Sequence, residues 1–130
     1  MKQTSKTTLD RIFSEFIRRR DADEYGYIRC ISCDKIVKWK ESDAGHFVNR
    51  GINSLRYDEK NVNAQCRHCN RFREGNAIGY HRGLILKYGD DVIEYLEIKK
   101  GNYCKLGKFE INALAAEYRK KLNELKNKAI

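Results

Sequence analysis

Apolar residues recur along this chain with two different periods, and the changes of period divide it into segments. Between residues 7 and 20 they return every three or four positions, with charged residues on the opposite face. This spacing predicts an amphipathic helix, because about 3.6 residues complete a helical turn. The same period predicts helices from Asn70 up to Gly89, within residues 90–100, and over residues 109–127.

The central part of the chain has the short apolar runs that are typical of strands. The stretches "YGYIRC" (25–30) and "KIVKW" (35–39) each predict one short strand. Residues 43–58 alternate short apolar pieces with Gly and Asn, which predicts a strand, a loop and a second strand. The pattern predicts an α+β fold class, with strands closing onto a helix in a small core and further α-helices at both ends.

Charge distinguishes the ends of the chain from its centre. The net charge is +9, of which residues 1–20 carry +4 and residues 105–130 carry another +4. We divide the chain into a basic amphipathic N-terminal helix (1–24), a core (25–89) and a C-terminal helical extension (90–130). Two explanations of this charge are about equally favoured: a nucleic-acid partner, or helix faces that are simply exposed to solvent.

No membrane partner is expected. No apolar run reaches the roughly 18–20 residues that span a bilayer, and the first residues lack the apolar stretch of a secretory signal. We therefore expect a cytoplasmic protein.

Four of the five cysteines form two Cys-x-x-Cys pairs. In a chain without an export signal this pattern favours a metal over disulfides. Two pairs supply the four thiolates of tetrahedral zinc, and the 32 residues between them are enough for a hairpin. Zinc binding also adds folding free energy to a small core. The sequence predicts a closed structural Zn²⁺ site, which leaves Cys104, His46 and His68 outside it; the ligands are Cys30, Cys33, Cys66 and Cys69.

Polar residues around the cysteine pairs follow a recognisable order. His46 lies in "DAGHFVNR", Asn61 precedes the second pair, and Asn70 follows Cys69 directly. This order resembles the HNH nuclease motif on a treble-clef (ββα-metal) scaffold, in a variant whose last His is replaced by Asn. From about Cys30 to Gly89, "DAGHFVNR…LRYDEKNVNAQCRHCNRFREGN…Y…GL" is similar to the phage NinG (Rap) recombination family. The resemblance implies a phage-encoded, metal-dependent and structure-specific DNA endonuclease that cleaves D-loops and Holliday junctions in the bacterial host cell.

The resemblance also implies roles for single residues. His46 would activate water, Asn61 would orient the His46 loop, and Asn70 would bind a divalent metal. The residue chemistry agrees, because a histidine with a pKa near about 6.5 accepts a proton at neutral pH. Mg²⁺ or Mn²⁺ prefers oxygen ligands, which makes Asp43 a plausible partner of Asn70, with Glu74 as an alternative or additional ligand.

Gly45 stands where many HNH proteins carry a metal ligand. Asp43 lies three residues before His46, so we expect it to reach the same site only if the chain bulges or bends at Gly45.

Simpler interpretations of these residues stay open. Asn61 could cap a turn, and Asn70 could cap a helix. Five arginines surround the motif and are candidates for contacts with DNA phosphates: Arg50, Arg56, Arg67, Arg71 and Arg73. Several aromatic residues could stack on unpaired bases, although such residues usually fill the core of a small protein: Tyr25, Tyr27, Trp39, Tyr57 and Tyr80.

Two further functions compete with the nuclease, namely a non-catalytic zinc-stabilised DNA-binding module and a protein-interaction adaptor. A homodimer would suit a nuclease that makes two symmetric nicks.

Overall fold

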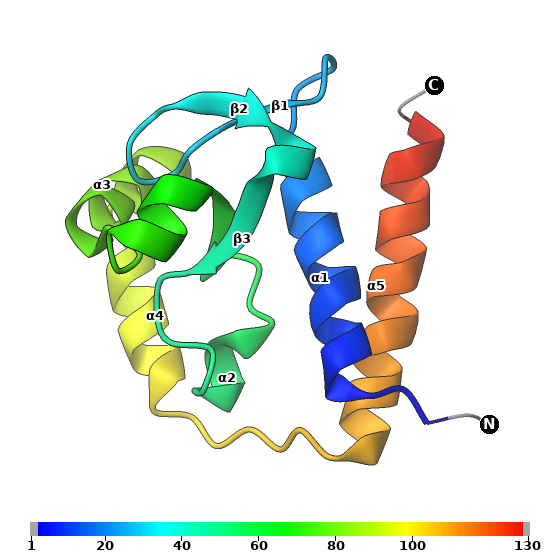
Figure 1. The fold of residues 1–130 in the computed structure, drawn as a ribbon. Helices are drawn as coiled ribbons and strands as arrows, with labels where there is room; N and C mark the ends of the chain where they lie inside the picture. Colours follow the sequence, from blue (N-terminus) through cyan, green and yellow to red (C-terminus); the bar gives the residue numbers. More distant parts are fainter. Residues whose placement is uncertain (1–2, 129–130) are drawn as a thin grey trace.

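The computed structural model describes residues 3–128, in which helices surround two short β-hairpins (Figure 1). The elements follow in the order α1 (Lys6–Arg20), β1 (Tyr27–Arg29), β2 (Ile36–Lys38), a 3-10 helix (Trp39–Glu41), β3 (Ser42–His46), α2 (Asn53–Arg56), β4 (Val62–Cys66), a π-helix (His68–Phe72), α3 (Ala77–Tyr88), α4 (Val92–Lys100) and α5 (Lys108–Lys128). Among the described helices, none combines the length and apolar character needed to cross a membrane.

The predicted α+β class is confirmed, as are three of the four predicted helices. The segments 7–20, 90–100 and 109–127 contain α1, α4 and α5. The Ser5 side chain caps the start of α1 by accepting a hydrogen bond from the Thr8 amide. At its other end three arginines occupy the last turn, where positive charge is favourable.

Two predicted elements differ from the structure. The second strand expected within residues 43–58 is wrong, because Asn53–Arg56 form the short helix α2 and β3 pairs with β4 instead. The single helix expected from Asn70 to Gly89 is interrupted. Glu74, Gly75 and Asn76 have φ values of 50°, 82° and 44°, and a right-handed helix cannot continue through such conformations.

Both β-hairpins are antiparallel. In the first, β1 and β2 flank the pair Cys30–Cys33. In the second, pairing runs without interruption from Ser42 opposite Cys66 to His46 opposite Val62. The pairing therefore has no bulge at Gly45, where we expected a bulge or a bend to be the condition for Asp43 to reach the site of His46.

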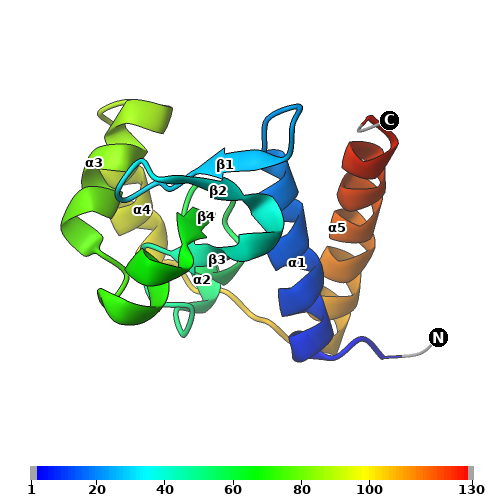
Figure 2. The same cartoon turned by 45° about the horizontal axis from the view of Figure 1, so that its top comes forward.

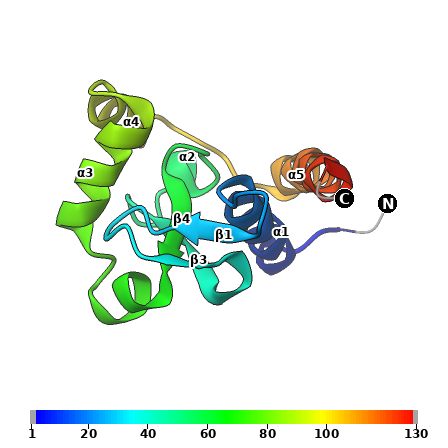
Figure 3. The same ribbon diagram turned by 90° about the horizontal axis from the view of Figure 1, so that it is seen from above.

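The β3–β4 pair lies between two groups of helices. Seen from above, α1 and α5 lie on one side of it and α3 and α4 on the other (Figure 3). The first group shares a hydrophobic cluster with β4 through Phe13, Phe16, Ile17, Val62 and Tyr118. The second group is held by a separate cluster, formed by Leu55, Tyr80, Leu84, Val92 and Leu96. The helices outside the core range 25–89 thus share hydrophobic clusters with it.

Helix α3 lies directly on the backbone of the first cysteine pair, and glycines make this approach possible. A Cβ atom on Gly79 would lie 2.1 Å from the Ser32 carbonyl oxygen, and one on Gly83 would lie 1.9 Å from that of Ile31. No real Cβ comes so close to a backbone atom, so any larger residue would push α3 away. The proximity of α3, β4 and the first hairpin is visible in Figure 2.

Candidate functional site

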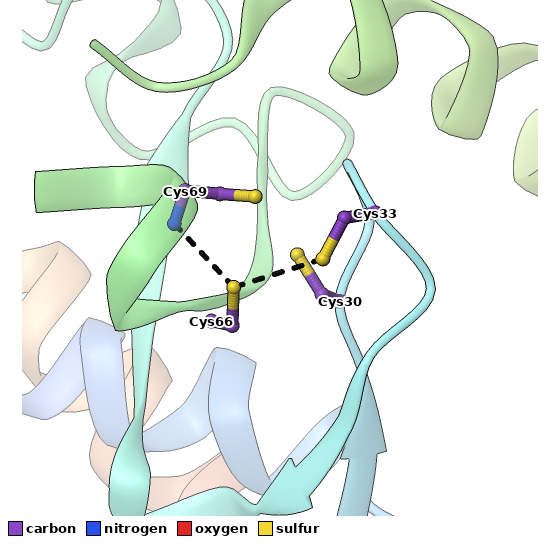
Figure 4. Close-up of side chains that lie close together, drawn as sticks. All are labelled: Cys30, Cys33, Cys66 and Cys69. Carbon is purple, nitrogen blue, oxygen red and sulfur yellow. Dashed lines mark hydrogen bonds between the residues drawn. The ribbon is translucent and has the colours of Figure 1, made fainter. Parts of the chain in front are cut away.

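The four paired cysteines converge on one point between the first hairpin and the end of β4 (Figure 4). Their sulfur atoms all lie within 4.8 Å of one another, and the Sγ atoms of Cys33 and Cys66 are 3.8 Å apart. Ligands about 2.3 Å from a tetrahedral zinc ion are roughly 3.8 Å apart, whereas a disulfide bond is only about 2.05 Å long. The predicted cluster is confirmed, and its geometry can hold a zinc ion.

Two of these sulfur atoms accept hydrogen bonds from the second cysteine pair and the turn that follows it. The Cys69 amide donates to Cys66 Sγ at 3.4 Å, and Asn76 Nδ2 donates to Cys69 Sγ at 3.3 Å. Burial raises the pKa of the Cys30 thiol to about 12, and the charge of a bound cation would favour its thiolate. Cys104 lies in the segment between α4 and α5, outside the cluster.

A cleft of about 630 Å³ lies beside this cluster. Its walls come from α1, β3, the loop after β3, α2 and residues 70–75. Seven of the residues predicted for the site line this cleft: Asp43, His46, Arg50, Arg56, Asn70, Arg71 and Glu74. Asn61, Arg67 and Arg73 are not among the lining residues.

His46 stands at the end of β3, with its ring in the cleft. Its Nε2 atom lies 2.9 Å from the Arg56 carbonyl oxygen. A carbonyl oxygen only accepts hydrogen bonds, so Nε2 carries the hydrogen and Nδ1 of the neutral ring has the free lone pair. Burial lowers the pKa of His46; the bond to the carbonyl opposes this shift, and the charges of Arg56 and Arg50 add to it. His46 is therefore a neutral proton acceptor at neutral pH.

Asn61 is fully buried, and its side chain holds together two segments, the loop that follows His46 and the helix α2 whose Arg56 carbonyl contacts the His46 ring. Its Nδ2 atom donates to the carbonyl oxygens of Val48 (3.1 Å) and Leu55 (3.0 Å), and its Oδ1 accepts from the Val48 amide (2.8 Å). Asn61 thus connects the loop after β3 to α2. This placement suits a positioning residue, since its side chain is outside the cleft.

Asp43 has both carboxylate oxygens engaged. Arg71 donates from Nε to Oδ2 and from Nη2 to Oδ1, each at 2.9 Å, and Asn70 Nδ2 also donates to Oδ2 at 2.9 Å. Burial raises the pKa of Asp43, but the bonds from Arg71 and Asn70 outweigh this and hold the pKa below its usual value. Asp43 is therefore an ionised carboxylate.

Asp43 and His46 reach the same cleft without a bulge. In a regular strand, residues three positions apart point to opposite faces. Both side chains nevertheless line the cleft: Asp43 meets Asn70 and Arg71 there, and His46 lies against the Arg56 carbonyl oxygen.

The cleft contains oxygen atoms of the kind that hard divalent cations prefer. Asp43 and Glu74 supply carboxylate oxygens, and the amide of Asn70 turns its nitrogen to Asp43, which leaves its oxygen for another partner. Such oxygen ligands suit Mg²⁺ or Mn²⁺. A cation at Asp43 would have to displace Arg71.

Sequence reasoning missed Asp10, which reaches the cleft from α1. Its carboxylate accepts hydrogen bonds from Arg56 Nη2 and from the Tyr57 hydroxyl, both at 2.6 Å. On the sequence Asp10 is one of several charged residues on a helix face, so only the packing of α1 reveals its position. The ion pair also fixes Arg56, whose side chain is only 12% exposed.

The remaining predicted arginines differ in their exposure and in their bonding partners. Arg50 and Arg73 are exposed. Arg67 donates to the Lys40 carbonyl oxygen at 3.0 Å and lies 3.8 Å from Asp43. Arg50 and Arg73 are therefore better placed for a contact with a phosphate than the half-buried Arg56, which is paired with Asp10.

These features define a small α+β domain with a cluster of four cysteines that can hold a metal ion, beside a polar cleft. The chain belongs to the NinG family, since the model of the family described as "Bacteriophage Lambda NinG protein" matches residues 1–128. It is 34% identical over 113 residues to "Protein ninG" of Escherichia phage lambda, which covers 86% of this chain and 52% of that protein. "Protein ninG" of Salmonella phage P22 matches with the same identity, over 86% of this chain and 53% of the relative.

The chain thus spans about half the length of the curated relatives it matches. No solved structure matches it. The resemblance to the NinG family that the central motifs indicated is confirmed, and it extends over the terminal helices as well.

Proposed function

We propose that this chain is a metal-dependent endodeoxyribonuclease of the HNH type, built on a treble-clef core. One observation carries the proposal. Asp43, His46, Asn70 and Glu74 come from three separate segments and line one cleft, beside the cysteine cluster. A purely structural zinc module does not require this convergence.

His46 is suited to the role of general base. Phosphodiester hydrolysis needs a water molecule that loses a proton as it attacks phosphorus. The Arg56 carbonyl fixes Nε2 as the donor nitrogen, so Nδ1 is the atom that accepts this proton. The lowered pKa keeps the ring in its neutral, basic form.

Asp43, Asn70 and Glu74 would hold a Mg²⁺ or Mn²⁺ ion in the same cleft. When bound, such an ion stabilises negative charge on the phosphate and on the leaving oxygen. Asn70 directly follows the zinc-site residue Cys69, so the cysteine cluster would hold the Asn70 side chain in place. Arg50, and Arg71 once it leaves Asp43, would contact the DNA backbone.

The substrate class follows from the resemblance to the NinG (Rap) recombination proteins. We propose branched recombination intermediates, D-loops and Holliday junctions, cleaved in the cytoplasm of the bacterial host during phage recombination. The net charge of +9 favours a polyanionic partner, and a homodimer would suit paired nicks.

One observation favours a second candidate, a zinc-stabilised DNA-binding module without catalysis. Both oxygens of Asp43 are engaged by Arg71, and a carboxylate held in this way is not free for a metal. A stable Asp43–Arg71 pair would leave the cleft as a binding surface only.

Incubation of the purified protein with labelled four-way junction, D-loop, flap and linear duplex separates the candidates. The nuclease proposal expects cleavage of the branched substrates in Mg²⁺ or Mn²⁺ and none in EDTA. Binding of the junction without cleavage in either metal would instead support the second candidate.

A further inference from the structure

Phe72 is a large apolar side chain held in solvent at the edge of the cleft. It is the last residue of the π-helix and is 77% exposed. Arg71, its neighbour in the chain, and Glu74, two residues further on, line the cleft, so the backbone that carries Phe72 runs along the edge of this cleft. None of the hydrophobic clusters found among residues 3–128 includes it.

A second aromatic ring lies beside Phe72. The His68 ring is one turn earlier on the π-helix and is also exposed, with a centroid separation of 6.2 Å and an angle of 30° between the ring planes. We call these two residues the aromatic rim. Arg67, Arg71 and Arg73, all exposed, flank the aromatic rim along the chain.

The backbone after Phe72 closes in a defined turn. The Gly75 amide donates to the Cys69 carbonyl oxygen at 3.0 Å, and the Asn76 amide donates to that of Arg73 at 2.7 Å. The first bond spans Phe72 and is anchored on a residue of the cysteine cluster, and the second begins at its neighbour Arg73. The segment that carries the ring is thus fixed in place.

The aromatic rim and the arginines beside it suit a nucleotide as a ligand. An exposed apolar ring with arginines next to it along the chain suits a partner that presents a flat π-face next to a negative charge, and a nucleotide has both. In a duplex the bases already stack on one another, whereas a base at a branch point or in a single strand leaves a face free.

We propose that the aromatic rim stacks on an unpaired base of a nucleic acid whose backbone lies in the neighbouring cleft. This inference rests on the proposed function, since it takes the cleft to bind DNA. It adds the feature by which the domain would distinguish branched or single-stranded DNA from plain duplex.

Binding in EDTA tests the proposal without any cleavage. Fluorescence anisotropy is measured for a flap with a single-stranded arm and for a blunt duplex, using wild type, Phe72→Ala and Phe72→Trp. Phe109→Ala is the matched control, because Phe109 is 79% exposed and lies on α5, away from the cleft. Circular dichroism and zinc content verify that each variant is folded.

Phe72→Ala should weaken flap binding about 5- to 150-fold, the range for the loss of one stacked base. Duplex binding should be unchanged, Phe72→Trp should retain flap affinity, and Phe109→Ala should behave as wild type. A 2-aminopurine at the branch should be quenched by wild type and less by Phe72→Ala.

Equal flap affinities of Phe72→Ala and wild type would overturn the stacking proposal while leaving the nuclease proposal intact. The same holds if Phe72→Ala changes only self-association in sedimentation, because the aromatic rim would then be a contact between copies. If wild type binds neither DNA, both proposals fail together.

Discussion

His46 acquires its chemical character from burial and from two neighbouring residues, Arg56 and Arg50. The Arg56 carbonyl fixes which ring nitrogen bears the hydrogen, and burial with two arginine charges lowers the pKa. The result is a histidine that stays neutral at pH values where an exposed histidine begins to take up a proton.

The lowered pKa of His46 can be measured by NMR titration of its ring. We predict a midpoint below the ordinary value of about 6.5, so the base is active at neutral pH and is lost as the pH falls through the midpoint. Arg50→Gln should raise the midpoint, because the Arg50 charge lowers it. Arg29→Gln, at an exposed position of strand β1, should leave the midpoint unchanged.

A midpoint at or above that of a free histidine would contradict this account, as would equal midpoints in the two arginine variants.

The Arg71 guanidinium binds the Asp43 carboxylate oxygens that a metal cation would use. We therefore expect Arg71 to lower the affinity of the cleft for a divalent cation. Arg71→Ala should bind Mn²⁺ severalfold more tightly than wild type in the absence of DNA, because the ion no longer displaces a guanidinium. Isothermal titration calorimetry measures this affinity directly. Arg73→Ala removes the same charge from a neighbouring exposed position and is the control.

If both arginine variants gain equally in affinity, the effect is one of general charge, and Arg71 has no special relation to Asp43.

At the scale of elements, two glycines determine how closely α3 approaches the first cysteine pair. Gly→Ala inside a helix usually stabilises a protein by about 0.5–1 kcal/mol. We predict the opposite for Gly83→Ala, a loss of about 1–3 kcal/mol, because the new Cβ would lie 1.9 Å from the Ile31 carbonyl oxygen. Gly101→Ala is the control, since its Cβ would have only an ordinary 3.7 Å contact.

Urea denaturation gives both free energies of unfolding. Stabilisation by Gly83→Ala would show that α3 does not rest on the first cysteine pair.

The long helices were predicted from the sequence because their apolar positions repeat, and the two three-residue strands β1 and β2 were predicted from short apolar runs. Helices α1 and α5 repeat their apolar positions over several turns. In contrast, α2 has only four residues, which is too short for a period to distinguish helix from strand. The left-handed turn at 74–76 contains a single glycine, so little in the residue pattern indicates the break before α3.

Some residues of the candidate site could likewise be predicted from the sequence, and others could not. The cysteine spacing and the order of His46, Asn61 and Asn70 were visible in the sequence, because they lie in local motifs. Asp10 reaches the cleft only through the packing of α1. Among the aromatic residues considered for stacking, Tyr80 is buried and donates its hydroxyl to the Gly45 carbonyl oxygen, whereas the exposed Phe72 was overlooked.

At the scale of the whole molecule, the cysteine cluster connects the first hairpin to the segment that carries Asn70. Loss of zinc should therefore disorder one wall of the cleft. We predict that Cys66→Ser loses zinc and most of its thermal stability, since zinc contributes on the order of 10 kcal/mol to folding in small zinc domains. Cys104→Ser, outside the cluster, should retain both.

Elemental analysis and thermal melts monitored by circular dichroism measure these quantities. A zinc-free Cys66→Ser protein with the melting temperature of wild type would refute a structural role for the metal.

The central claim is that the Nδ1 atom of His46 accepts the proton of the attacking water. The most direct test is the single-turnover cleavage rate of a four-way junction in Mn²⁺, for wild type, His46→Ala and His81→Ala. The account predicts a loss of about 10²- to 10⁴-fold in His46→Ala, with zinc content and junction binding retained, and a wild-type rate for the exposed His81→Ala. Equal cleavage rates for His46→Ala and wild type would contradict it.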